Sequence, residues 1–158
     1  FNNVGNQLEL FFHRVSPLEE TSKFICLLLT LLLFKKQKVP KSRNSVVLKS
    51  VVIGLSFAFF ENLGYAQHGI DVAVIRNFTS TIAHMFFGYI MGYILTTNTD
   101  TYGKVIRLIK YPLSLIVPIL CHGVWNYTLS VSMVPFKTLI IMLCFIAMYI
   151  NLTNKNIN

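Results

Sequence analysis

Residues 46–65 read VVLKSVVIGLSFAFFENLGY, a run of about 20 residues in which apolar side chains dominate. A helix rises about 1.5 Å per residue, so a run of this length crosses the roughly 30 Å of hydrocarbon in a bilayer. The run also contains Glu61, an ionisable residue that is costly to expose to lipid. It therefore predicts a transmembrane helix with one face turned toward protein.

The composition of the whole chain is typical of a membrane protein. Apolar residues make up 54% of the 158 positions, charged residues make up 13%, and the mean hydropathy is +0.59. The net charge of +8 comes from lysines and arginines that lie in short segments between apolar runs. Cations in short loops between apolar runs indicate which loops are cytoplasmic. We therefore expect the chain to bind a lipid bilayer and not nucleic acid. The cysteines, Cys26, Cys121 and Cys144, have no C-x-x-C spacing and indicate neither a disulfide framework nor a zinc finger.

Further apolar runs precede and follow the first one. They are too long and too continuously apolar for the alternating strands of about 10 residues in an outer-membrane barrel. We predict an all-α, multi-pass transmembrane helix bundle that forms a single domain over residues 1–152, with a polar tail at 153–158. The chain begins at Phe1 without a signal-peptide pattern, and we expect it to be truncated at its N-terminus. The predicted spans, about five in number, are 17–34, 46–65, 74–96, 111–134 and 136–152.

The loops between the runs predict an orientation in the cell membrane. Loop 35–49, KKQKVPKSRNSVVLK, is rich in lysine and should be cytoplasmic. Loop 66–73 contains neither lysine nor arginine and should be external. The segment YGKVIRLIKYP at 102–112 is basic again, so the alternation holds through three consecutive loops.

The ionisable residues inside the predicted spans fall in the outer half of the membrane. Glu19, Glu20 and Glu61 lie about one turn from the external ends of their spans. His84 lies about 15 Å and His122 about 18 Å from the external ends of theirs. Ionisable groups at such depths face the interior of a bundle, so we expect these residues to converge there.

Each histidine lies on a face of small and polar residues with a spacing of four. The first face consists of Arg76, Ser80, His84, Gly88 and Gly92, and the second of Ser114, Pro118, His122, Asn126 and Ser130. Gly88 and Gly92 form a G-x-x-x-G pattern that lets another helix approach closely. Pro118 lacks a backbone donor and favours a kink below His122.

A structural explanation exists for some of these residues taken singly. Ser16 and Glu19 match a capping box, and Glu19 and Lys23 match a favourable i,i+4 pair. A single membrane histidine often only packs or forms an interhelical hydrogen bond. The convergence of two histidines and three glutamates at similar depth favours a functional site over these explanations.

Four motifs in order carry a family resemblance. They are EETSK at 19–23, FENLGY at 60–65, RNFTSTIAH at 76–84 and HGVWN at 122–126. Together they resemble the PrsW family of intramembrane proteases, relatives of the type II CAAX prenyl endopeptidases and bacteriocin-related membrane proteins. The resemblance implies a helical membrane peptidase, grouped with metallopeptidases, that cleaves a membrane-anchored protein near the external side. Family members usually carry further helices before the double glutamate, and this chain departs from them there.

Peptide hydrolysis needs a base for water, polarisation of the carbonyl and a proton for the leaving amine. The catalytic candidates are Glu19, Glu20, His122 and Asn126. Adjacent residues point about 100° apart on a helix, so we expect one glutamate to activate water and the other to be held by Lys23 or a neighbouring helix.

A Zn²⁺ ion is compatible with the same set of residues. Glu61, His84 and His122 would supply the three protein ligands of an open catalytic site. The chain has no H-E-x-x-H motif, so such a site would be assembled from several helices. A metal-free mechanism, with glutamate as base and His122 and Asn126 as oxyanion donors, fits equally well.

Two functions without proteolysis could use the same residues. One is a non-catalytic membrane protein such as a bacteriocin self-immunity protein. The other is a small proton-linked transporter with Glu61 and the histidines as a relay, which the short chain without an inverted repeat disfavours. The motifs specify neither the substrate nor the oligomeric state.

Overall fold

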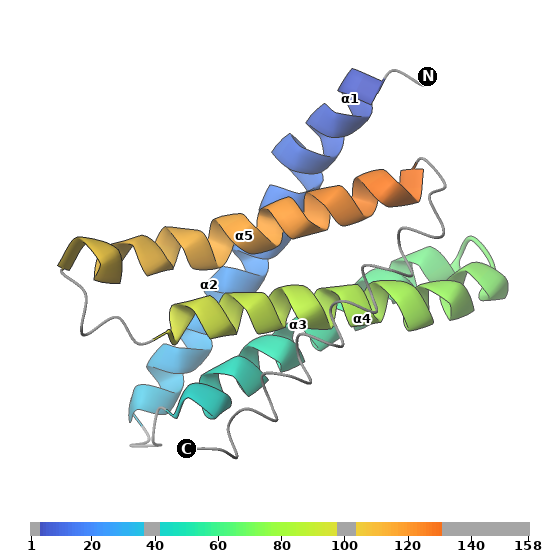
Figure 1. Ribbon diagram of the computed structural model, residues 1–158. Coiled ribbons are helices and arrows are strands. Elements are labelled where there is room, and N and C mark those ends of the chain that lie inside the picture. The colour runs from blue at the N-terminus through green and yellow to red at the C-terminus, as the bar shows by residue number, and fades with distance from the viewer. Residues whose placement is uncertain (1–3, 37–41, 98–103, 131–158) are drawn as a thin grey trace, which may run out of the picture.

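The computed structural model describes residues 4–36, 42–97 and 104–130, and these ranges are helical apart from short turns (Figure 1). The prediction of an all-α fold is confirmed for this part of the chain, which contains no strand. The elements are α1 (Val4–Glu9), the π-helical segment η1 (Leu10–Val15), α2 (Ser16–Lys36), α3 (Arg43–Ala66), α4 (Ile70–Leu95) and α5 (Lys104–Ser130).

The first three elements follow one another without a break. Figure 1 shows them as one blue helical path that passes behind α5. Ser16 has helical backbone angles, φ −62° and ψ −41°, and its N–H bonds to the carbonyl of Phe11. Its side-chain oxygen is buried and makes no hydrogen bond within the described part of the chain. The capping-box explanation is therefore wrong, because the helix does not begin at Ser16 but continues through it.

Among the described residues, three helices are long and apolar enough to cross a membrane: Arg43–Ala66, Ile70–Leu95 and Leu108–Ser130. They overlap the predicted spans 46–65, 74–96 and 111–134. The predicted span 17–34 is helical within α2, but it carries Glu19, Glu20 and Lys23 and is not one of the three. The prediction of about five spans is thus not confirmed in the described ranges. The span 136–152 and the tail 153–158 lie outside them.

Helices α3 and α4 pack more extensively than any other described pair. The buried face of α3 repeats every four residues and consists of Val46, Ser50, Gly54, Ala58 and Asn62. A Cβ at Gly54 would lie within 3.0 Å of the His84 carbonyl oxygen, and one at Gly88 would lie equally close to the Ser50 carbonyl oxygen. The predicted role of the G-x-x-x-G pattern in close helix packing is confirmed, and the partner is α3. This contact brings the end of α3, with Glu61, beside His84.

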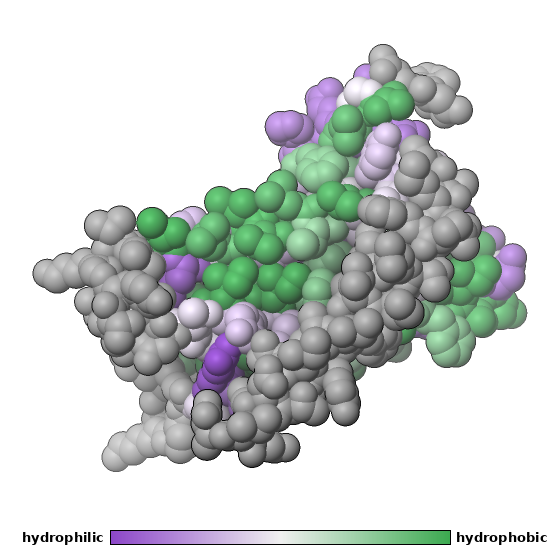
Figure 2. Space-filling model, viewed as in Figure 1, coloured by the Kyte–Doolittle hydropathy of each residue, from purple (hydrophilic) through white to green (hydrophobic). Residues whose placement is uncertain are grey.

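The outer face of α5 is apolar, and its inner face carries buried polar residues. Leu113, Ile116, Leu120 and Val124 are exposed at spacings of three and four residues. Ser114 and His122, on the opposite side, are buried. Figure 2 shows a broad apolar surface over the region that α5 occupies in Figure 1. An apolar exterior around a polar interior is the arrangement expected of a bundle surrounded by lipid.

Candidate active site

Lys23 lies at the centre of a buried polar cluster. Its Nζ donates a hydrogen bond to Glu20 Oε1 at 2.6 Å and lies 2.7 Å from His84 Nδ1. The ammonium group also stands 4.3 Å from the centre of the Phe57 ring. The side chains of Lys23 and Glu20 are 1% and 0% exposed, so this ion pair is removed from solvent. The sequence predicts that one of the two glutamates is held by Lys23 or a neighbouring helix, and the structure shows that it is Glu20, three residues from Lys23 on α2. The Glu19–Lys23 pair, considered as a structural explanation, is not formed in the described part of the chain.

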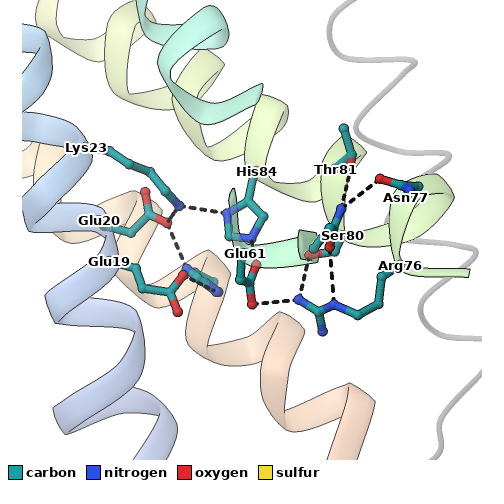
Figure 3. A network of polar contacts seen from close by, with 11 residues as sticks. Glu19, Glu20, Lys23, Glu61, Arg76, Asn77, Ser80, Thr81 and His84 are labelled. Atoms are coloured by element: carbon teal, nitrogen blue, oxygen red, sulfur yellow. Dashed lines mark hydrogen bonds and ion pairs between the residues drawn. The ribbon is translucent and has the colours of Figure 1, made fainter. Parts of the chain in front are cut away.

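His84 is held through both of its ring nitrogens (Figure 3). Because a lysine ammonium can only donate, Nδ1 accepts the hydrogen bond from Lys23. Nε2, which lies 2.9 Å from Glu61 Oε2, then carries the hydrogen and donates it to that carboxylate. Glu61 thus faces protein, as the sequence predicts for an ionisable residue in an apolar helix.

His122 is oriented by the neighbouring glutamates of α2. Its Nδ1 lies 2.8 Å from Glu20 Oε1, and its Nε2 lies 3.7 Å from Glu19 Oε2. A carboxylate accepts, so Nδ1 donates its hydrogen to Glu20, and Nε2 on the other side of the ring faces the Glu19 carboxylate. The ring stacks on Phe87 at 4.9 Å and stands edge-on to His84 at 5.1 Å between ring centres.

Glu19, His84 and His122 have the composition of a metal site. One ligand atom from each of these three residues lies within 4.8 Å of the others. Glu19 Oε2 is buried and has no hydrogen-bond partner in the described part of the chain. Imidazole nitrogens and a carboxylate oxygen are the ligands that Zn²⁺ takes in open catalytic sites. The residues therefore fit a bound divalent metal ion.

Of the three metal ligands predicted from the sequence, the structure groups the two histidines but not Glu61 with the candidate metal site. His84 and His122 lie together, and the carboxylate beside both is that of Glu19. Glu61 bridges His84 and Arg76, with Oε2 toward the imidazole and Oε1 toward the guanidinium. A contact with a carboxylate commonly fixes the orientation of a metal-binding imidazole.

Arg76 belongs to the site, although the sequence indicated only that it shares a face with His84. Its Nη2 donates to Glu61 Oε1 at 2.6 Å, and its Nε donates to Asn62 Oδ1 at 3.2 Å. Its guanidinium lies 3.6 Å from the centre of the Tyr65 ring. The amide of Asn62 in turn donates to Asn77 and Thr81 (Figure 3). The sequence feature that could have identified Arg76 is its spacing of eight residues from His84, which is two repeats along one helix face.

A cleft of about 420 Å³ lies against this cluster. Its lining includes Glu19, Glu61, Arg76 and Asn126, from four different helices. The cleft lies where α2 and α4 begin and where α3 and α5 end, so these four ends meet at one end of the bundle. His84 and His122 are buried behind it. Three of the predicted site residues therefore border a space that is large enough for a ligand.

The chain was compared with known proteins. The family model of the PrsW family intramembrane metalloprotease matches residues 1–152. "Protease PrsW" of Shouchella clausii is 31% identical over 104 residues, which are 60% of this chain and 46% of the relative. The proteins of the same name from Clostridioides difficile and Bacillus subtilis are each 28% identical, over 90% and 82% of this chain and 60% and 58% of their own lengths.

The chain therefore spans about half to three fifths of the length of these relatives. No solved structure matches it. The family model nevertheless covers nearly all of the chain, including every residue of the buried cluster. The chain belongs to the PrsW family of intramembrane metalloproteases.

Proposed function

We propose that this chain forms the catalytic part of an intramembrane peptidase, which hydrolyses a peptide bond of a membrane-anchored protein. The observation that carries the proposal is the cluster of Glu19, His84 and His122 beside a cleft at one end of the bundle. Its relatives are named as proteases, which supports the same reaction.

We propose further that α2 is a fourth membrane span and that residues 136–152 form a fifth. The charges of α2 are compatible with a bilayer because Glu20 and Lys23 neutralise each other in the interior. With loop 35–49 cytoplasmic and loop 66–73 external, the cleft faces the external side of the membrane.

Glu19 is the residue proposed to accept the proton of the attacking water. Its Oε2 lacks a hydrogen-bond partner among the described residues, and Nε2 of His122 lies 3.7 Å from it. Water held between these two atoms would be activated within a site that hydrocarbon otherwise keeps dry. Asn126 borders the same cleft and can donate its amide hydrogen to the oxyanion that forms on the attacked carbonyl.

In the alternative mechanism with a metal, Glu19, His84 and His122 would hold a divalent ion such as Zn²⁺, and Glu19 would be a ligand instead of the base. Such an ion supplies Lewis-acid polarisation and lowers the pKa of a bound water. Glu20 keeps the His122 ring in the orientation in which Nε2 faces Glu19. Both nitrogens of His84 are engaged, so coordination there requires that Lys23 leave Nδ1 or Glu61 leave Nε2. Under a metal-free mechanism these contacts stay as they are.

Cleavage of a single-span reporter in liposomes tests the proposal. The variants are Glu19→Gln, Glu20→Gln and His122→Ala, and the matched control is Glu9→Gln, an exposed glutamate outside the cluster. We expect the control to cut like the parent and the three variants to lose at least about a hundredfold in rate, as for removal of a general base. If all three variants cut like the parent, the peptidase proposal is overturned. A folded parent that cuts nothing would support a non-catalytic membrane protein.

A further inference from the structure

The lining of the cleft combines apolar and polar residues. The apolar ones are Leu10, Phe11 and Val15 of η1 with Leu129 of α5. The polar ones are Glu19, Glu61, Tyr65, Arg76, Asn126 and Ser130. A ligand that fits this lining must present both apolar surface and hydrogen-bonding groups. A peptide segment has this character.

Among the polar residues of the lining, Arg76 has a hydrogen-bond donor to spare. Its Nε and Nη2 are occupied by Asn62, Glu61 and Ser80, and its plane stacks on Tyr65. Nη1 makes no hydrogen bond to any residue that the structure describes. In Figure 3 this nitrogen points away from the network of dashed lines. The other contacts hold the guanidinium in place, so little conformational freedom is lost when Nη1 binds a ligand.

The charges around Arg76 select the kind of acceptor. The guanidinium is already paired with Glu61 at 2.6 Å, and Glu19 borders the same cleft. An incoming carboxylate would meet these two carboxylates and be repelled. A neutral carbonyl oxygen can accept from Nη1 without this penalty.

Free backbone carbonyls favour an extended segment over a helix. A cleft of about 420 Å³ holds only a few residues in either conformation. In an extended segment the backbone carbonyls are free of internal hydrogen bonds and can accept from Nη1.

We propose that Arg76 is a substrate-positioning residue whose Nη1 donates to a backbone carbonyl of an extended, neutral substrate segment. An apolar side chain of that segment packs against Phe11, Leu10 and Leu129. This inference rests on the proposed peptidase function and adds a substrate class to it: sites flanked by apolar residues, without acidic side chains next to the cleaved bond.

Steady-state cleavage of the reporter by Arg76→Lys tests the positioning role. Lysine keeps the positive charge opposite Glu61 but lacks the planar fork that presents Nη1. We expect KM to rise about tenfold, the loss expected for one charge-assisted hydrogen bond, with kcat within about twofold of the parent. The matched control is Arg14→Lys, at an exposed arginine 3.7 Å from Glu9, and it should change neither constant. An unchanged KM, or a loss in kcat alone through disturbance of Glu61 and His84, overturns the inference.

A second measurement leaves the enzyme unaltered and varies the substrate. Reporters with leucine beside the cleaved bond should be cut at least about tenfold more efficiently than reporters with aspartate there. Equal efficiency contradicts the proposed cleft chemistry. If the parent cuts no reporter, the peptidase proposal fails. Binding of a fluorescent apolar peptide to the parent and to Arg76→Lys then still decides the role of Arg76, because equal affinity overturns it and weaker binding by the variant supports it.

Discussion

Glu19 and Glu20 are neighbours in the sequence but lie in different surroundings. The Glu20 side chain is fully buried and accepts hydrogen bonds from Lys23 and His122. The Glu19 side chain is 18% exposed and lines the cleft. The two carboxylates diverge because adjacent positions on a helix point about 100° apart. Glu20 therefore holds Lys23 and His122 in place, while Glu19 faces the space that a substrate would occupy.

Glu20→Gln should destabilise the protein, whereas Glu19→Gln should not. Glutamine at position 20 leaves the Lys23 ammonium buried without an opposite charge, and loss of one partner of a buried ion pair lowers the free energy of unfolding by about 3–5 kcal/mol. Thermal unfolding in detergent measures both variants against the parent. Equal melting temperatures for the two variants would contradict the different roles assigned to these residues.

The metal content of the purified protein should depend on His122. If Glu19, His84 and His122 hold an ion, elemental analysis should find about one Zn²⁺ per chain, and His122→Ala should lose most of it because two protein ligands bind weakly. The matched control is His13→Ala, at an exposed histidine of η1. A chelator should abolish cleavage, and added Zn²⁺ should restore it. Full activity in a metal-depleted sample would rule out the metal mechanism and support the glutamate-dependent one.

At the scale of elements, the approach of α3 to α4 determines the geometry of the site. Gly54 lies against the backbone of His84, and Gly88 lies against the backbone of Ser50. These contacts permit the short distance between Glu61 on α3 and His84 on α4. Small residues at this helix interface thus set the distances within the polar cluster, although they do not line the cleft themselves.

Gly54→Ala should reduce both stability and activity. The added Cβ would meet the His84 carbonyl oxygen, so α3 must shift away from α4 and Glu61 must move from His84. Overpacking of this kind typically costs about 1–3 kcal/mol. Gly64→Ala on the same helix is the matched control, because a Cβ there meets nothing within 4 Å. Unfolding midpoints and cleavage rates check both variants, and similar behaviour of the two would refute the packing argument.

At the scale of the whole molecule, the polar groups of four helices gather inside an apolar exterior. The cleft opens at one end of the bundle, where α2 and α4 begin and α3 and α5 end. The sequence-based topology assigns this end to the external side, through the lysine-rich loop at 35–49. The side of the membrane on which the site opens decides which part of a membrane-anchored protein can reach it.

Labelling of single cysteines tests this orientation. In a background without Cys26, Cys121 and Cys144, a membrane-impermeant maleimide should label Gln67→Cys in intact cells. Ser42→Cys, in the lysine-rich loop, should be labelled only after the cells are permeabilised. Labelling of both from the same side would mean that the predicted topology is wrong.

Hydropathy and helical periodicity are local properties, and they were sufficient for much of this protein. Apolar runs predicted the all-α fold and the positions of α3, α4 and α5. The spacing of four residues placed His84 with Gly88 and Gly92 on one buried face. The order of four short motifs indicated the family.

The pairing of the charged groups was decided only by the tertiary structure. Periodicity shows which residues share a face of one helix, but not how that helix is rotated against its neighbours. The pattern could not show that Lys23 pairs with Glu20 and contacts His84, that Arg76 holds Glu61, or that Glu19 lies beside both histidines. Close packing at Gly54 and Gly88 sets those rotations between residues far apart in the chain, and a change in rotation would exchange the partners of every charged side chain.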